Sequence, residues 1–417
     1  MEPKIRLKGF QGGWKESAFS ESFDSLKNNS LSRAELDDSG TVYNIHYGDV
    51  LIAYNECVKI DKEVKTFVKN AEVARKLYHS CAIKNGDVIF ADAAEDNTVG
   101  KCTEVIAQEA DAIVSGLHTI PYRPKKEFAS RYLGYYLNSK AYHDQLLPHI
   151  QGTKISSISK RALAQTHISY PSDKNEQQAI ASYFQHLDSL IQSTTKKIES
   201  LKQVKAASLQ TMLPREGETT PRVRFKGFEG EWKSVTLGEI AEMQSGGTPS
   251  SHNSEYYNGN IPFLSITDMT NAGKYINSTI KSITEYGLAN SSTRIYPAGT
   301  LMYAMYASLG KCSITNIDVA ISQAILGFSL SNEIDREFLY QYLCNIESGI
   351  KCFGQTGTQT NLSKSIVEKF NILIPTLSEQ KLVGNLLSSL DSQISLQTQC
   401  LEKLKQIKSA CLDNMFV

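Results

Sequence analysis

A seven-residue pattern that occurs twice constrains this chain more than any other feature. Residues 177–213 contain no Pro or Gly, and one set of positions recurs in alternating steps of four and three. Such a seam is typical of a long helix that packs along another helix. Adding 203 to each number gives a second seam, with a polar residue at the fifth place and a lysine at the eighth in both copies. The apolar positions are Ile180, Phe184, Leu187, Ile191, Ile198 and Leu201, then Val383, Leu387, Leu390, Ile394, Leu401 and Leu404.

Two matched seams in one chain favour an intramolecular antiparallel helix pair. After the first helix the chain turns, forms the segment between the helices and returns to the second helix, which favours an antiparallel pairing. An intermolecular coiled coil is the alternative. Thr194 and Gln397 fall in the middle of the seams, and we expect them to help fix the register at some cost in stability.

The rest of the chain is also written twice. The phrase PKIRLKGFQGGW at 3–14 returns as PRVRFKGFEGEW at 221–232, and the two copies hold both tryptophans. The triplet Gly-Lys-Cys occurs at 100–102 and 310–312, and Pro171 and Pro375 each precede a Glu-Gln pair. The offset falls from 218 through 210 to 203, which indicates a duplicated scaffold with loops of different length.

These repeats predict an α+β fold class. We expect two mixed α/β globules in a pseudo-two-fold arrangement, separated by two long helices that form an intramolecular antiparallel coiled coil. The predicted segments are 1–150 (first globule), 151–220 (first long helix and linker), 221–353 (second globule) and 354–417 (second long helix). Apolar runs after glycine predict strands at 48–53, 86–91 and 299–304, and apolar stripes predict helices at 126–139 and 335–347.

Composition sets broad limits. The 417 residues exceed one compact core, and 44 basic side chains balance 44 acidic ones, so charge neither indicates nor excludes a nucleic-acid partner. No apolar run approaches the roughly 20 residues of a membrane span, and the first residues lack the apolar core of a signal peptide. The eight cysteines have no CxxC spacing. We therefore expect a cytoplasmic protein with reduced thiols and no zinc module.

Catalytic motifs are missing from the sequence. It has no GxxxxGK[ST] phosphate loop, no GxGxxG, no Asn-Pro-Pro-aromatic phrase and no HExxH or HxH spacing. Asp49, Glu63 and Lys65 fit a loose nuclease pattern, which we interpret as a chance match. The sequence therefore predicts recognition without catalysis and no metal site.

At this point the ordered duplication resembles the DNA-specificity subunit of type I restriction–modification enzymes. The resemblance covers essentially the whole chain. Its phrases are the two openings, SGGTP at 245–249 followed by EYYNG at 255–259 and IPFL at 261–264, and the prolines before Glu-Gln. The first globule lacks the SGGTP and EYYNG phrases and carries NGDVIFADAAE at 85–95. Carrying positions from one globule to the other is therefore unsafe outside the aligned phrases.

The resemblance implies that each globule is a target recognition domain for one half of a split DNA site. The helices would set the spacer and dock two methyltransferase (modification) subunits, and restriction subunits would join that core. This chain would bind no cofactor, and S-adenosylmethionine, ATP and Mg²⁺ would belong to the partner subunits. The alternatives are a coiled-coil scaffold without a DNA role and a self-contained nuclease or methyltransferase.

Candidate DNA contacts follow from the need for donors to phosphates and side chains that reach base edges. For each, an ordinary turn or a solvated face is the alternative. The candidates are basic (Lys84, Lys101, Arg123, Lys154, Lys311), hydroxyl or amide (Thr98, Ser245, Thr248, Ser308, Gln355, Thr358), aromatic (Tyr256, Tyr257, Tyr306) and Gly247. A docking face for partners, or only a solvated face, is formed by Lys196, Lys197, Glu199, Lys202, Glu402, Lys403 and Lys405.

Overall fold

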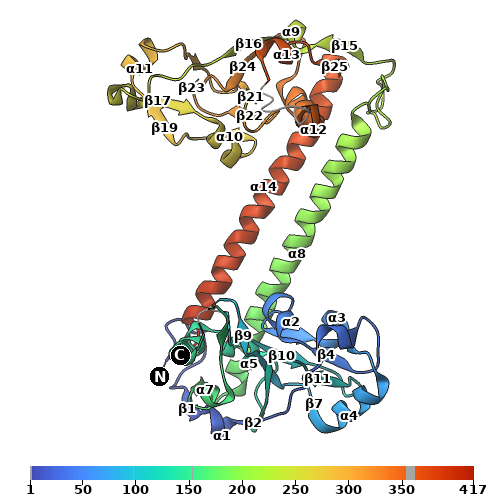
Figure 1. The fold of residues 1–417 in the computed structure, drawn as a ribbon, viewed down its shortest axis with the longest axis vertical. Helices are drawn as coiled ribbons and strands as arrows, with labels where there is room; N and C mark the ends of the chain where they lie inside the picture. The colour runs from blue at the N-terminus through green and yellow to red at the C-terminus, as the bar shows by residue number, and fades with distance from the viewer. Residues whose placement is uncertain (1, 97, 153, 354–361) are drawn as a thin grey trace. The chain divides into compact units, whose positions relative to one another are not determined.

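A computed structural model describes residues 2–96, 98–152, 154–353 and 362–417 (Figure 1). The chain forms two compact units, Met1–Thr195 with Gln399–Val417 (unit 1) and Lys196–Thr398 (unit 2). Each unit thus takes one globule and a part of both long helices, whereas the four predicted segments follow the order of the chain. In the described part of the chain, no helix is both long and apolar enough to cross a membrane.

The two heptad stretches are helices α8 (Lys174–Met212) and α14 (Leu377–Asn414). Every predicted seam position is buried or half-buried. In unit 1 the Lys408 Nζ lies 2.7 Å from an Asp188 oxygen, and in unit 2 the Lys205 Nζ lies 2.5 Å from an Asp391 oxygen. Lys205 follows Asp188 by 17 residues in α8, while the partner of Lys205 precedes the partner of Asp188 by 17 residues in α14. The predicted antiparallel pair is confirmed.

Two five-stranded sheets form the first globule. The first has the order β2 (Phe23–Ser25), β12 (Thr119–Pro124), β8 (Val88–Ala91), β10 (Cys102–Ile106), β5 (Cys57–Lys59), and only β10–β5 is parallel. The second has the order β3 (Leu36–Asp37), β6 (Phe67–Val68), β4 (Tyr43–Ile45), β11 (Ile113–Ser115), β7 (Ala82–Ile83), with β4–β11 parallel. Two small pairs are β1 (Lys15–Ala18) with β14 (His167–Tyr170), and β9 (Ala93–Ala94) with β13 (Ser156–Ser157).

The second globule repeats this topology, except that its second sheet has four strands in the described residues and no counterpart of the edge strand β3. Its first sheet runs β16 (Ala241–Ser245), β24 (Ile325–Leu330), β21 (Leu301–Ala304), β22 (Cys312–Thr315), β18 (Tyr275–Ile276), again with one parallel pair at the same edge. Its second runs β19 (Lys281–Ile283), β17 (Tyr257–Leu264), β23 (Val319–Ile321), β20 (Ile295–Tyr296), with β17–β23 parallel. The pair β15 (Lys233–Thr236) with β25 (Asn371–Ile374) matches β1–β14. The expected mixed globules are confirmed, and the strand order is duplicated too.

Short helices connect the strands. Those of unit 1 are α1 (Phe19–Ser22), α2 (Tyr47–Ile52), α3 (Ile60–Glu63), α4 (Ala71–Cys81), α5 (Tyr132–Leu137), α6 (Lys140–His143) and α7 (Lys160–Leu163). Those of unit 2 are α9 (Leu237–Ile240), α10 (Ile266–Ala272), α11 (Glu285–Ala289), α12 (Arg336–Phe353) and α13 (Lys364–Val367). Single 3₁₀ turns are η1 (Arg33–Glu35), η2 (Leu147–His149) and η3 (Ser254–Tyr256).

The strands expected at 86–91 and 299–304 are confirmed as β8 and β21, and the helix expected at 335–347 is confirmed as α12. The strand expected at 48–53 is wrong, because this run forms helix α2. The His46 side chain accepts the backbone N–H of Gly48 at 3.2 Å and so caps the helix start. Val50 is fully buried while Ile52 is 89% exposed, which a strand would not allow because alternate residues share a face.

The helix expected at 126–139 is shorter in the structure, where α5 covers only Tyr132–Leu137. Arg131 adopts a left-handed backbone conformation with φ of 75°. The buried Glu104 carboxylate accepts the backbone N–H groups of Arg131 at 2.6 Å and of Gly134 at 2.8 Å. These bonds place the start of the helix after Arg131.

Candidate nucleic-acid interface

The repeated cysteines align the first sheets of the two globules residue by residue. In antiparallel pairs, Phe90 of β8 faces Cys102, and Tyr303 of β21 faces Cys312. On the other side of these strands, Phe90 faces Ile120 and Tyr303 faces Leu326. On the next strand of each sheet, Ser25 pairs with Tyr122 and Met243 pairs with Phe328. The same alignment therefore makes Ser25 equivalent to Met243. Each position in one sheet therefore has a defined counterpart in the other.

Three loops meet at the end of β8 in unit 1 and of β21 in unit 2. We call them the loop rim, formed in unit 1 by residues 26–32, 92–96 with 98–100, and 116–118, and in unit 2 by 244–250 (which begins with the end of β16), 305–311 and 322–324. The second and third loops are joined by backbone bonds from Asp92 N–H to the His118 oxygen (3.1 Å) and from Met305 N–H to the Ala324 oxygen (2.8 Å). The two rims are thus built on equivalent bonds.

The segment between each globule and its long helix also touches the rim. In unit 1, Ser156 and Ser157 pair with Ala94 and Ala93, and the Ile158 N–H donates to the Asp92 oxygen at 2.9 Å. This segment carries the exposed Lys154. In unit 2, the Leu362 N–H donates to the Met305 oxygen at 3.1 Å. The predicted contacts Gln355 and Thr358 lie outside the described residues.

Seven of the thirteen predicted DNA contacts that the structure describes lie in these rims. Thr98 lies in the unit 1 rim, where its hydroxyl donates to the Asp96 carboxylate at 2.5 Å. In unit 2, the Thr248 hydroxyl bonds to the Gln323 amide oxygen. Ser308 and Tyr306 are half-buried on the second loop, and Ser245 is exposed. The structure therefore gathers residues that lie far apart in sequence.

The SGGTP phrase is explained by close packing against β23. A Cβ at Gly246 would overlap the carbonyl oxygen of Ile321, and a Cβ at Gly247 would overlap the Ser292 hydroxyl. Only glycine fits at both positions without movement of the backbone. The Tyr257 hydroxyl donates to the Pro249 oxygen at 2.5 Å, which places the predicted Tyr257 behind this loop as a support.

Lys101 and Lys311 have a structural position. The Lys101 ammonium donates to the carbonyl oxygens of Leu51 and Tyr54, both at 2.9 Å, at the end of α2. The Lys311 ammonium donates to the Thr270 oxygen at 3.2 Å, in the last turn of α10. Burial lowers the pKa of Lys101. Both lysines complete the C-terminal end of a short helix, where free carbonyl oxygens favour a cation.

Three further predicted contacts, Arg123, Lys84 and Tyr256, lie outside the rim and do not adjoin it. Arg123 binds both oxygens of the buried Asp87 at 2.8 and 2.7 Å, and the backbone N–H of Lys84 donates to the same carboxylate at 2.7 Å. Asp87 precedes β8 while the rim follows it, so Arg123 and the exposed Lys84 lie at the opposite end of that strand. Tyr256 packs its ring on Tyr286, with 5.2 Å between ring centres.

The carboxylates of the loose nuclease pattern take part in local contacts. Asp49 accepts Arg33 at 2.5 Å, and Glu63 accepts the backbone N–H of Lys59 at 2.6 Å. Over the described ranges, no group of three or more His, Cys, Asp or Glu side chains is arranged to hold a metal ion.

Comparison with known proteins agrees with this duplicated architecture. A family model described as the type I restriction modification DNA specificity domain matches residues 11–203 and again residues 229–406. The chain belongs to this family. Its two specificity domains correspond to the two copies of the repeated fold.

Individual relatives cover parts of the chain. The type I restriction enzyme MjaIX specificity subunit of Methanocaldococcus jannaschii is 26% identical over 197 residues, covering 45% of this chain and 44% of the relative. The EcoR124I/EcoR124II specificity subunit of Escherichia coli is 28% identical over 186 residues, covering 43% and 45%. The chain thus aligns with less than half of either relative. The crystal structure of a type I S subunit from M. genitalium shares the fold, with a TM-score of 0.65, 16% identity, and coverage of 100% of this chain and 99% of that one.

Sequence reasoning missed the residues that fasten each specificity domain to its helix. Arg6 binds both oxygens of Glu176, at 2.7 and 2.8 Å, and Arg224 binds Glu379 in the same way, at 2.6 and 2.8 Å. The two glutamates are 2% and 1% exposed. The signal was present, because the arginines belong to the repeated opening phrase and the glutamates to the repeated Glu-Gln pair.

The seam lysines at the eighth place form a second missed contact. In unit 1, Lys408 lies 2.6 Å from Glu56 in addition to its contact with Asp188. Burial disfavours the charged ammonium, but these two carboxylates outweigh it and raise the pKa of Lys408. The Tyr135 hydroxyl donates to the second Asp188 oxygen at 2.7 Å. We call Lys408, Asp188, Glu56 and Tyr135 the unit 1 junction.

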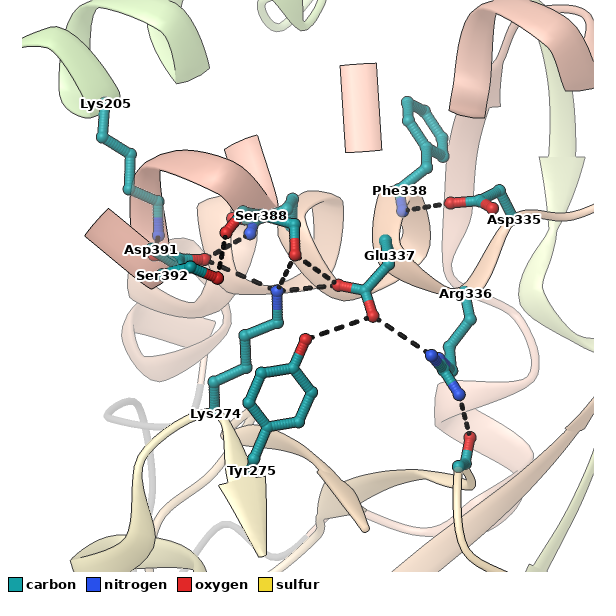
Figure 2. Close-up of polar contacts among 12 residues, drawn as sticks. Lys205, Lys274, Tyr275, Asp335, Arg336, Glu337, Phe338, Ser388, Asp391 and Ser392 are labelled. Atoms are coloured by element: carbon teal, nitrogen blue, oxygen red, sulfur yellow. Dashed lines mark hydrogen bonds and ion pairs between the residues drawn. The ribbon is translucent and has the colours of Figure 1, made fainter. Parts of the chain in front are cut away.

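The unit 2 junction is a larger network (Figure 2). Asp391 accepts Lys205 at 2.5 Å and the Gln341 amide at 2.5 Å. The globule adds Lys274, whose ammonium lies 2.7 Å from Glu337, 2.7 Å from the Ser388 hydroxyl and 3.7 Å from Asp391. Burial alone would raise the pKa of Glu337, but its bond with Lys274 lowers it. We define this junction as Lys205, Asp391, Gln341, Lys274, Glu337 and Ser388.

Proposed function

We propose that this chain is the DNA-specificity subunit of a type I restriction–modification complex, and that each globule reads one half of a bipartite double-stranded site. One observation carries the proposal. The same two sheets occur twice with equivalent backbone bonds, while the loop rims on them carry different side chains. A constant scaffold with variable exposed loops suits two readers of different sequences.

The rim side chains suit DNA recognition chemically. Hydroxyl oxygens such as those of Thr98 and Thr248 can accept hydrogen bonds from base edges, and an exposed lysine such as Lys154 can neutralise a phosphate. Half-sites in one major-groove face recur about every 10 bp. Two rims reading short half-sites would therefore leave unread bases between them.

The helices α8 and α14 would then set the number of unread bases and dock two methyltransferase subunits. The charged side chains from Lys196 to Lys202 and from Glu402 to Lys405 supply the docking face. Adenine methylation and DNA cleavage would be performed by the modification and restriction subunits. Those partners would carry S-adenosylmethionine, ATP and Mg²⁺, and this chain would bind none of them.

The test is to express the full chain with its modification subunits in cells without restriction activity and to map N6-methyladenine. We expect one motif with two defined halves and a fixed spacer. A second arm inserts four residues after Lys196 and four after Gln399, which adds about one turn to each helix at the boundary between the units. The halves should stay the same while the spacer changes. An undivided motif contradicts the proposal that each globule reads one half-site, and an unchanged spacer contradicts the proposal that α8 and α14 set the number of unread bases.

The remaining readings predict other results. A scaffold without a DNA role would give no salt-dependent, sequence-specific DNA binding in the presence of the modification subunits. A self-contained enzyme would methylate or cut DNA when the purified chain alone receives S-adenosylmethionine or Mg²⁺.

A further inference from the structure

We propose that the unit 1 loop 26–32 is a base-reading loop and that Lys27 and Ser30 are its base-contacting side chains. The inference rests on the proposed function and deepens it, since it names specificity residues in a stretch that has no sequence likeness to the SGGTP phrase.

The loop 26–32 of unit 1 is structurally equivalent to the SGGTP loop of unit 2. In the paired strands, Ser25 faces Tyr122 and Met243 faces Phe328. Beyond these strands, the Asn29 N–H donates to the Ser115 oxygen at 2.8 Å, and the Gly247 N–H donates to the Ile321 oxygen at 3.1 Å. Ser115 ends β11, and Ile321 ends the equivalent β23. The offset of 218 from the opening phrase therefore continues through the loop without a gap.

This alignment gives each member of the SGGTP loop a counterpart. Lys27 takes the place of Ser245, and Ser30 takes the place of Thr248. Asn28 and Asn29 take the places of the two glycines. The phrase seemed absent from the first globule because every side chain in it differs.

Different residues hold the equivalent loops of the two units in place. Gly246 and Gly247 hold their loop by close contact with Ile321 and Ser292. In unit 1 the buried Asn29 holds it by hydrogen bonds instead. Its amide donates to Ser115 and to the Asn44 side chain, both at 2.9 Å, and its oxygen accepts the Leu31 N–H at 3.0 Å. Both anchors are internal, so the flanking side chains are left to solvent.

The flanking side chains face solvent in both loops. Lys27 and Ser30 are exposed, as are Ser245 and Thr248. Within the described ranges, neither Lys27 nor Ser30 has a side-chain ion pair or hydrogen bond, whereas Lys101 and Arg123 are bound to protein oxygens. A lysine offers a donor to the O6 and N7 atoms of guanine, and a serine hydroxyl can both donate and accept. Unit 1 therefore presents a free ammonium where unit 2 presents a hydroxyl.

The test maps N6-methyladenine for the full chain with its modification subunits, using Lys27→Ala, Ser30→Ala and Thr248→Ala. Lys15→Ala is the matched control, because Lys15 is also an exposed lysine and lies on β1, away from the rim. We expect Lys27→Ala and Ser30→Ala to relax base preference by about tenfold at positions in one half-site only. Thr248→Ala should relax the other half only, and Lys15→Ala should change neither. Lys27→Arg should keep most of the preference, because guanidinium also donates to guanine.

Each other result overturns the inference. An unchanged motif for Lys27→Ala and Ser30→Ala does so and leaves the proposed function intact, provided that the wild-type motif is split. A uniform loss of methylation at every base choice, with a smaller salt slope, identifies Lys27 as a phosphate contact and also overturns base reading. Thermal melting of each variant distinguishes misfolding, which would contradict the freedom of these side chains. A wild-type complex without a defined motif removes the proposed function itself.

Discussion

Both junctions contain the same lysine–aspartate ion pair between α8 and α14, but they differ in the charged side chains that the globule adds. A lysine and an aspartate cross the helix pair in both units, and they repeat at offset 203 as Lys205 with Lys408 and Asp188 with Asp391. In unit 1 the globule adds an acid, Glu56. In unit 2 it adds a base and an acid, Lys274 and Glu337.

The difference shows which part of a junction was free to diverge. Both copies of the helix pair carry the same ion pair, whereas the two globules add different charges to it. In unit 1 two carboxylates depend on one ammonium, whereas in unit 2 two ammoniums serve two carboxylates. The unit 1 junction should therefore be the more fragile.

The largest expected effect breaks this comparison directly. Lys408→Met leaves Asp188 and Glu56 without their cation, and we expect it to lower the free energy of unfolding by about 3 kcal/mol. Lys205→Met should cost about 1 kcal/mol, because Lys274 remains near Asp391. Urea denaturation of the full chain measures both. The control Lys405→Met removes only an exposed pair and should cost less than about 0.5 kcal/mol.

Equal losses for Lys408→Met and Lys205→Met would contradict the difference between the junctions. The double variant Lys408→Met with Glu56→Gln sharpens the comparison. It should recover part of the lost stability, because one of the two unpaired carboxylates is then neutral.

A second effect comes from Glu104, whose counterpart in unit 2 is Ile314. Burial raises the pKa of Glu104 from its usual 4.5 to about 7. The folded chain then binds more protons than the unfolded chain between these values, so stability falls as the pH rises from about 4.5 through about 7. A shift of this size corresponds to a loss of roughly 3 kcal/mol in the free energy of unfolding over the whole pH range. Most of this loss falls between pH 5 and pH 8.

The measurement is urea denaturation at pH 5 and pH 8, applied to the wild type and to Glu104→Gln. Glutamine cannot ionise, and it keeps an acceptor for only one of the two backbone N–H groups, that of Arg131 or that of Gly134. We expect the pH dependence to shrink in this variant. The same dependence in both proteins would show that the Glu104 carboxyl is not its source.

The smallest expected effect separates Lys101 from Lys311. Lys101→Met loses two carbonyl contacts and should cost about 1 kcal/mol, while Lys311→Met loses one longer contact and should cost about half of that. Neither should change the salt dependence of DNA binding by the complex. A drop of about 0.9 in the slope of log K against log salt would show instead that the lysine meets a phosphate.

The sequence by itself determined the periodic parts of this protein. The seam from Ile180 onward predicted α8, and its copy predicted α14, because helix packing imposes a spacing that can be read without coordinates. The repeated phrases predicted two equivalent globules. They also held Arg6 and Glu176, although only the structure showed that these repeated residues bind each other.

Local pattern failed where tertiary contacts chose the conformation. The run at 48–53 has strand-forming residues but folds as α2 under the His46 cap, and α5 starts late because the Glu104 carboxylate, from a distant strand, binds Arg131. A lysine in the sequence also does not show which groups its ammonium contacts in the folded chain. Lys101, a predicted DNA contact, binds two carbonyl oxygens at the end of a helix, whereas Lys27 is not among the predicted contacts and has a free ammonium in the described part of the chain.

Only the tertiary structure decided that residues 26–32 and SGGTP are the same loop. Backbone hydrogen bonds fix the position of a residue whatever its side chain is. Asn29 and Gly247 can therefore occupy equivalent positions although their side chains differ. The sequence recorded the duplicated scaffold, since packing preserves it. The divergent rims became comparable only through the strands that hold them.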